Sequence, residues 1–446
     1  MMANNPKYTQ SEPHLKVFHD RSELIYETGE NQVFNEGKLS KEAQRRLRIV
    51  KDAFEAGFLP NLIDECRKPD VDLGELSQEH HALLQGLVDS VTSEVGRAIV
   101  GLTVMQLCIK CIIPEQSIRL HKGGNSYGPT RFSWCDGIPM RSLDKSFVTP
   151  VLRSYDILRT NADGVMMTRS LAENYPYSKL YKAAIRGARD EWLEIVERLE
   201  TSEINSEIAL RHLLALLLNK SDRFQALADE TLLAVQAAVD KGPSIDSVIE
   251  FIQTFIDSSD YSARLFEIAM HSLFQVLDDN MLIEGNLKPL SQMRSANKKH
   301  GNIGDIEVTI GIGTLEISEA WDAKYGKPYL RDELEELNEK LNDHLETQLV
   351  GFVVDQPPVL KREIIDRVHE LEDLHGIEIK ILSFLEWVDF QLGQVGNKNQ
   401  LSQEWLIALA ETLCQKRRER APIDEPADSW VAELLTQVQV WGNSLE

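Results

Sequence analysis

Two acidic residues and a lysine, Asp305, Asp322 and Lys324, lie on two stretches in which apolar and polar residues alternate. The stretches are separated by residues 311–314, a segment with two glycines, so the pattern predicts a β-hairpin. If the turn is centred on the middle of this segment, Asp305 lies opposite Ala320 and shares a face with Asp322 and Lys324. Two carboxylates can hold divalent cations while an ammonium orients or activates a water, which is the chemistry of phosphodiester hydrolysis.

Further elements are expected on both sides of this hairpin. Amphipathic patterns predict helices, and short apolar runs predict strands. In chain order these are a helix containing 264–269, the hairpin, an acidic helix over 330–349, a buried strand over 350–354, a helix over 359–374 and a strand over 377–382. The sequence therefore predicts an α/β (α+β) fold, with a mainly helical N-terminal region before these elements.

This order of elements, together with the acidic pair and the lysine, resembles the PD-(D/E)XK nuclease core, most closely that of type II restriction endonucleases. The resemblance covers about residues 260–394 and implies a C-terminal mixed sheet flanked by helices. Asp305 matches the first carboxylate of the motif, and Asp322 and Lys324 match the second carboxylate and the lysine. The chain departs from the motif at Gly304, where no Pro precedes the first carboxylate, and in having Asp rather than the frequent Glu in the second place.

The resemblance implies a Mg²⁺-dependent endonuclease that cuts double-stranded DNA at a short recognition sequence, read by a homodimer. It implies that Asp305 and Asp322 ligate Mg²⁺, with the carbonyl of Ala323 as a further ligand and Glu267 joining from the preceding helix. Lys324 would then hold or deprotonate the attacking water.

Alternatives remain open at this level. Glu378 and Lys380 have the same spacing on a predicted strand and could form the catalytic pair, with Asp355 as their partner. The carboxylates and lysine of the hairpin could form a merely solvated face, and Glu267 suits a surface salt bridge as well as a metal site. A rival of another class is a non-catalytic acidic helical interaction protein.

The net charge of the 446-residue chain is −23, which argues against affinity for polyanions along its whole length. Residues 117–189 are the exception, with twelve Lys and Arg against five Asp and Glu, interleaved with aromatic residues and glycines. We expect this segment to contact DNA through His121 and a set of residues whose side chains can reach phosphates or base edges. The residues of this set are Lys122, Asn125 and Arg131. A second set just before the hairpin, Arg294, Lys298 and Lys299, is placed to hold the DNA backbone near the scissile phosphate.

The domain organisation follows from changes in pattern along the chain. The sequence predicts a flexible arm, a mainly helical DNA-recognition region, a nuclease-like α/β domain and C-terminal helices. Their bounds are 1–40, 41–257, 258–395 and 396–446.

The five cysteines are odd in number and mostly lie in apolar settings, which is typical of a reducing compartment. A zinc site from Cys108, Cys111, His121 and Cys135 is the alternative to a buried helix at the first two. Because no apolar run approaches the length of a membrane span and the N-terminus does not resemble a signal peptide, we expect a cytoplasmic protein with no membrane contact.

Overall fold

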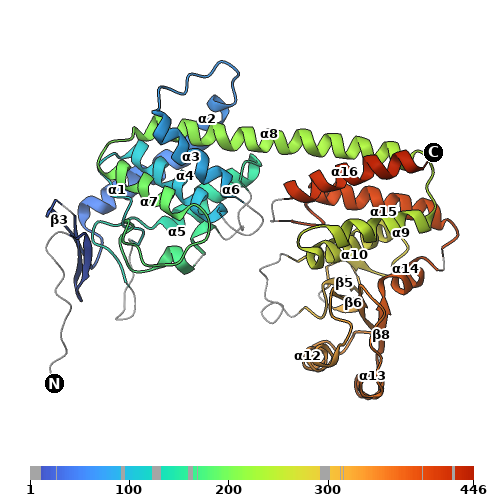
Figure 1. Ribbon diagram of the computed structural model, residues 1–446. Helices are drawn as coiled ribbons and strands as arrows, with labels where there is room; N and C mark the ends of the chain where they lie inside the picture. Colours follow the sequence, from blue (N-terminus) through green and yellow to red (C-terminus); the bar gives the residue numbers. More distant parts are fainter. Residues whose placement is uncertain are drawn as a thin grey trace. The chain divides into compact units, whose positions relative to one another are not determined.

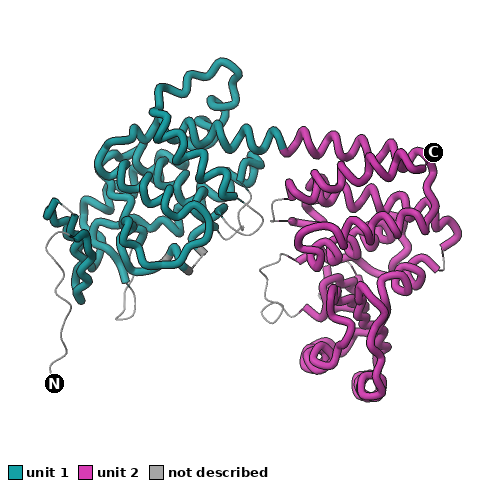
Figure 2. The backbone as a smooth tube through the Cα atoms, viewed as in Figure 1, with its two compact units in different colours: residues 1–223 teal, residues 224–446 magenta. Residues whose placement is uncertain are grey.

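The computed structural model describes residues 12–445 apart from 27, 92–95, 123–131, 159–163, 168, 292–301, 312, 315, 394 and 424–426. The chain divides into two compact units, Met1–Arg223 and Phe224–Glu446 (Figure 2). Helix α8 (Ser206–Val239) supplies residues to both units.

The second unit is built around a five-stranded mixed sheet of order β4-β5-β6-β7-β8 (Figure 1). The strands are β4 (Asn286–Leu287), β5 (Ile306–Thr309), β6 (Ile317–Lys324), β7 (Leu349–Val354) and β8 (Glu378–Ser383). The first three strands pair antiparallel, and β6, β7 and β8 pair parallel. The predicted hairpin and the two strands after it are therefore confirmed, as is the mixed α/β fold class.

Helices cover both faces of this sheet because alternate residues of each strand point to opposite sides. One face packs Ala320 and Phe352 against α12 (Arg331–Leu341) and α13 (Arg362–His375), the crossover helices that the parallel strands require. The opposite face packs Trp321 and Val353 into the core formed by the remaining helices. These are the second part of α8, α9 (Ile245–Ser258), α10 (Ser262–Asp279), α14 (Phe384–Leu392), α15 (Lys398–Leu413) and α16 (Asp428–Ser444).

The domain boundary differs from the predicted one at 257/258. The predicted nuclease-like segment shares one hydrophobic core with the end of α8, with α9 and with the two C-terminal helices. The contact boundary instead falls inside α8, between residues 223 and 224. A long amphipathic helix gives no local signal of such a boundary, because the change lies in which distant residues its apolar side chains contact.

The first unit is mainly helical around α4 (Arg97–Ile112), which is buried from Ile99 to Lys110. Its other helices are α1 (Lys41–Glu55), α2 (Phe58–Cys66), α3 (Gln78–Asp89), α5 (Met140–Leu143), α6 (Thr149–Ser154) and α7 (Arg189–Glu200). The flexible arm predicted for 1–40 is wrong over its described part. Strands β1 (His14–Val17), β2 (Arg21–Ile25) and β3 (Asn31–Asn35) form an antiparallel sheet there. Leu24 and Phe34 of that sheet pack against Leu120 and Trp134, far along the chain.

Candidate functional site

Asp305, Asp322 and Lys324 converge at one end of the β5–β6 hairpin, as predicted. The Nζ of Lys324 lies 2.7 Å from Oδ2 of Asp322. The backbone N–H of Ala323 donates to Oδ2 of Asp305 over 3.0 Å, and the carboxyl groups of Asp305 and Asp322 interact directly. Two carboxyl groups and an ammonium thus share one small site.

The register of the hairpin differs from the predicted one by two residues. Ala320 pairs with Glu307 rather than with Asp305, and continuing this register places Asp305 beside Asp322. The loop is centred later than the middle of 311–314, since Ile310 bonds to Glu316, and a bulge beside Val308 adds a further residue. A shift of one residue would have moved the carboxylates to opposite faces, whereas a shift of two keeps them together.

The site is buried and strained by like charges. Asp322 is only 6% exposed, and burial together with the neighbouring Asp305 raises its pKa to about 8. Burial also raises the pKa of Asp305, and Glu267 adds to that rise. Although burial opposes it, the carboxylate of Asp322 raises the pKa of Lys324. The ammonium form of Lys324 is therefore favoured, and one proton is retained between two carboxyl groups that cannot both ionise freely.

One oxygen of this site has no partner: Oδ1 of Asp322 is buried without a hydrogen bond to any described group. A buried acceptor left unpaired is costly, so it marks a position where a donor or cation would be stabilising. Mg²⁺ is usually held by one or two carboxylates together with waters, and Asp305 and Asp322 meet that requirement. The N–H of Ala323 points to Asp305, and the C=O of a strand residue points to the same side, so the carbonyl of Ala323 also faces the β5 edge.

Glu267 lies on α10 close enough to influence Asp305, but it is engaged by an arginine. Nη1 of Arg264 lies 2.5 Å from its Oε1, and Arg264 also donates to the carbonyl of Ser291 over 2.9 Å. Glu267 therefore forms a salt bridge with Arg264 and also lies close enough to Asp305 to raise its pKa. Over the described ranges, no set of three or more His, Cys, Asp or Glu side chains is close enough to form a ready-made metal site.

A turn directly after β6 holds Lys324 in place, and the sequence reasoning missed it. The N–H of Lys327 donates to the carbonyl of Lys324 over 3.2 Å, and Gly326 adopts φ +72°, a conformation that favours glycine. Asp355 accepts the N–H of Gly326 at 2.7 Å, and Glu333 pairs with Lys327 at 3.2 Å. The sequence position of Asp355, directly after the predicted buried strand, could have indicated that it lies near the end of the neighbouring strand β6.

The alternative site at Glu378 does not assemble. Glu378 and Lys380 pair with each other at 2.5 Å on the edge strand β8, and the ammonium of Lys380 lies 4.9 Å from the ring centroid of Phe390. Glu378 is opposite Leu349, at the start of the parallel strand β7, whereas Asp355 follows the end of β7. The strand length therefore separates Asp355 from Glu378 by roughly 15–20 Å.

Most of the predicted DNA contacts lie outside the described residues. These are Asn125, Arg131, Arg294, Lys298 and Lys299. Lys122 is described and half-buried; it donates to Oδ1 of Asn174, and burial lowers its pKa. The predicted DNA contact of His121 is wrong. Its side chain is 1% exposed and stacks on Tyr177 with ring centroids 4.4 Å apart, so it cannot enter a DNA groove. Burial lowers the pKa of His121 to about 3.

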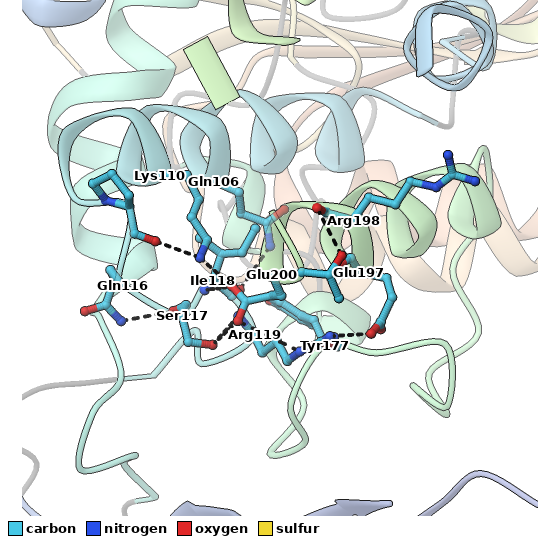
Figure 3. Close-up of polar contacts among 12 residues, drawn as sticks. Gln106, Lys110, Gln116, Ser117, Ile118, Arg119, Tyr177, Glu197, Arg198 and Glu200 are labelled. Atoms are coloured by element: carbon cyan, nitrogen blue, oxygen red, sulfur yellow. Dashed lines mark hydrogen bonds and ion pairs between the residues drawn. The ribbon is translucent and has the colours of Figure 1, made fainter. Parts of the chain in front are cut away.

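Several cations of the segment 117–189 are neutralised internally. Arg119 is fully buried, bonded to Glu197 at 2.9 Å and to the carbonyl of Tyr177 at 2.7 Å (Figure 3). Beside it, Glu200 accepts the N–H of Ile118 and pairs with Lys110 at 3.1 Å. The positive balance of the segment is therefore partly structural: it fastens this stretch to the acidic residues of α7.

The zinc alternative has no support among the described residues. Cys108 is buried within α4, where burial raises the pKa of its thiol, and burial raises that of Cys111 to about 11. Over the described residues, no set of three or more His, Cys, Asp or Glu side chains, these cysteines included, is placed to hold a metal ion. The helix predicted there is confirmed.

Comparison with models of protein families and with curated proteins returns no match for this chain. Within the part of the chain that the structure describes, no helix has the length and apolar character needed to span a bilayer.

Proposed function

We propose that this chain is a Mg²⁺-dependent endonuclease that hydrolyses phosphodiester bonds of double-stranded DNA at a specific sequence, in the manner of a type II restriction enzyme. The observation that carries the proposal is the site of Asp305, Asp322 and Lys324. The buried carboxyl group of Asp322, with a raised pKa of about 8 and an oxygen that has no partner among the described residues, lies beside the partly buried carboxyl group of Asp305 and an ammonium at the end of a hairpin. Perturbed titratable groups gathered in this way are typical of functional sites.

The surrounding fold supports the same proposal. A helix, the hairpin, and two helix–strand pairs follow one another in the order of the PD-(D/E)XK core, and the strands occupy the sheet order β5-β6-β7-β8. Fold order alone carries no chemistry, so any activity must come from the residues of the site.

Each residue has a distinct role in the proposed mechanism. Asp305 and Asp322 would hold Mg²⁺, with the carbonyl of Ala323 and Glu267 as further candidates. When bound, Mg²⁺ would stabilise the charge that develops on the scissile phosphate. Because its ammonium form is favoured, Lys324 acts from Nζ as a donor that orients the attacking water or the phosphate rather than as a base.

Recognition of DNA belongs to the proposal as well. Lys122, Asn125 and Arg131 would contact the groove or backbone, and Arg294, Lys298 and Lys299 would hold the backbone near the cut. A cytoplasmic homodimer would place one site on each strand of the duplex.

Cleavage of plasmid DNA tests the proposal directly. The wild-type protein should nick or linearise plasmids from a broad sequence panel, methylated and unmethylated, with Mg²⁺ but not with EDTA. Asp305→Asn and Asp322→Asn should each lose cleavage by several orders of magnitude and weaken Mg²⁺ or Mn²⁺ binding in calorimetry, because each removes a charged ligand. Cation binding that is equal in all three proteins would refute the metal assignment.

Lys324→Ala separates catalysis from binding. It should retain the fold, metal binding and most DNA binding while losing cleavage by about 10²- to 10⁴-fold, since it removes a donor at the reacting centre. Lys380→Ala is the matched control, because Lys380 pairs with the second residue before it in the same way as Lys324 but on the edge strand. If the Lys380 variant does not cleave DNA and the Lys324 variant does, the active site lies on β8 and not on the hairpin.

A further inference from the structure

Glu307 lies on β5 two residues after Asp305, and the proposed mechanism gives it no role. Because alternate residues of an extended chain point to the same side, its side chain leaves the sheet on the face that carries Asp305. Glu307 is buried, with only 3% of the residue exposed. A buried carboxylate is costly unless it is paired and hydrogen-bonded, so the partners of Glu307 indicate what it does.

Both oxygens of this carboxyl group have partners. Oε1 accepts the backbone N–H of Ile303 at 2.6 Å and, more weakly, that of Gly304 at 3.4 Å. Oε2 lies 2.5 Å from Nζ of Lys288. Lys288 is itself fixed beside Glu307, because its backbone N–H donates to the carbonyl of Glu307 over 2.9 Å. The carboxylate therefore connects the chain just after β4 to the two residues directly before Asp305.

The backbone before Asp305 bends closely against β6. The N–H of Asp305 donates to the carbonyl of Trp321 over 2.9 Å, and a Cβ on Gly304 would lie 2.7 Å from that same oxygen. No side chain fits there, which explains why Gly stands where the nuclease motif has Pro. The bend leaves the buried residues Ile303 and Gly304 outside the β5–β6 ladder, and buried amides need an acceptor. Glu307 supplies that acceptor.

These contacts distinguish Glu307 from the candidate metal ligands. The carboxylate of Glu307 is already bonded to two amides and an ammonium, whereas Oδ1 of Asp322 has no partner in the described part of the chain. A metal ligand must direct a lone pair at the cation, and the contacts of Glu307 direct its oxygens at the backbone and at Lys288 instead. Glu307 therefore acts on Asp305 through the chain that leads into it.

We propose that Glu307 is a positioning residue that, together with Lys288, fixes the bend at 303–304 and thereby sets where the carboxylate of Asp305 lies for Mg²⁺. This inference rests on the proposed function in taking Mg²⁺ as the ligand, but it concerns metal binding and not cleavage. A positioning role requires an acceptor oxygen at the reach of a Glu side chain. A ligand or a purely electrostatic role requires the negative charge instead, so two substitutions separate the roles.

Calorimetric titration of the full-length protein with Mn²⁺ compares Glu307→Gln, which keeps the length and an acceptor oxygen, with Glu307→Asp, which keeps the charge but is one carbon shorter. The Asp variant should bind Mn²⁺ about 10- to 100-fold more weakly than the parent. The Gln variant should stay close to the parent, because Lys288, whose side chain is 32% exposed, can turn to solvent. Glu316→Gln, at an exposed glutamate of the same hairpin, is the matched control and should bind as the parent does. Circular dichroism checks that each variant is folded.

The positioning role is overturned if the Gln variant loses as much Mn²⁺ affinity as the Asp variant or more, if both folded variants bind as the parent does, if the control loses as much, or if the parent binds no cation. Parallel cleavage assays with Mg²⁺ keep the two proposals apart. A parent that never cuts, with variants in the expected order of Mn²⁺ affinity, upholds the positioning role and refutes the nuclease. A parent that cuts, with both variants binding Mn²⁺ normally, refutes the positioning role alone.

Discussion

At the scale of single residues, the site combines groups that a stable interior would avoid. Asp322 is buried, its Oδ1 has no described partner, and its carboxyl group lies beside that of Asp305. Lys324 compensates for part of this cost through its 2.7 Å contact with Asp322. Buried charges in protein interiors are normally paired fully. The free-energy cost of the incompletely paired carboxyl groups at this site is one that binding of a cation would reduce.

The raised pKa of Asp322 predicts a stability that depends on pH. A carboxyl group in the unfolded chain titrates near about 4, whereas burial and Asp305 raise the pKa of Asp322 to about 8 in the folded chain. Between these values the folded state binds more protons, so the free energy of unfolding falls as the pH rises from about 4 to 8. Asp322→Asn cannot ionise and should therefore gain stability relative to wild type towards pH 8, by on the order of a few kcal/mol.

Urea unfolding in EDTA at pH 5 and pH 8 measures this difference. Glu378→Gln, which changes an exposed carboxylate of the same sheet, serves as the control and should show no comparable gain. The same gain for Asp322→Asn at both pH values would contradict the assigned titration. Excess Mg²⁺ should diminish the gain, because the wild-type carboxylate is then favoured in its ionised form.

At the scale of elements, β6 and the turn after it decide where Lys324 lies. β6 is central in the sheet, with β5 antiparallel on one side and β7 parallel on the other. The turn is tied to the end of β7 through Asp355 and to α12 through Glu333. Two separate segments therefore fix the turn that follows Lys324, which is the support that a preorganised site requires.

Removing the tie at Asp355 should reduce cleavage more than stability. Asp355→Ala leaves the N–H of Gly326 without its acceptor and lets the turn move, so we expect a loss of about 10- to 100-fold in kcat for a stability loss of about 1 kcal/mol. Mg²⁺ affinity should change little, because Asp305 and Asp322 are untouched. Asp366→Ala, an exposed aspartate of α13, is the matched control. A parental kcat for the Asp355 variant would show that the turn does not position Lys324.

At the scale of the whole molecule, each unit has its own buried core. The core of the first unit gathers around α4, and the cores of the second unit lie on the two faces of its sheet. The network of Arg119, Glu197 and Glu200 belongs entirely to the first unit. The proposed catalytic residues belong entirely to the second.

This separation predicts that a defect in one unit spares the other. Arg119→Ala removes the buried cation that pairs with Glu197 and donates to the carbonyl of Tyr177, and it should destabilise the first unit by about 3–5 kcal/mol. Calorimetric unfolding should show one transition moved to lower temperature, while Mg²⁺ still raises the other. Arg45→Ala, which breaks an exposed ion pair of the same unit, should shift neither transition appreciably. Equal shifts of both transitions in the Arg119 variant would show that the units unfold together.

The sequence predicted the elements of the second unit well because their signals are local. Alternation of apolar residues identified the hairpin and β8, a continuous apolar run identified β7, and helical spacing identified α10, α12 and α13. The spacing of Asp322 and Lys324 on one strand also determined that their side chains share a face. These features depend only on residues close in sequence, so a single chain is sufficient to reveal them.

Only the tertiary structure decided the rest, because it depends on contacts between distant residues. The bulge beside Val308 set the register that brings Asp305 next to Asp322, and packing of Leu24 and Phe34 on Trp134 ordered an N-terminal sheet whose short strands carry weak patterns. Composition counted Arg119 as a free positive charge, but folding paired it with Glu197. Charge is a property of sequence, whereas its availability to a ligand depends on burial and on the partners that folding supplies.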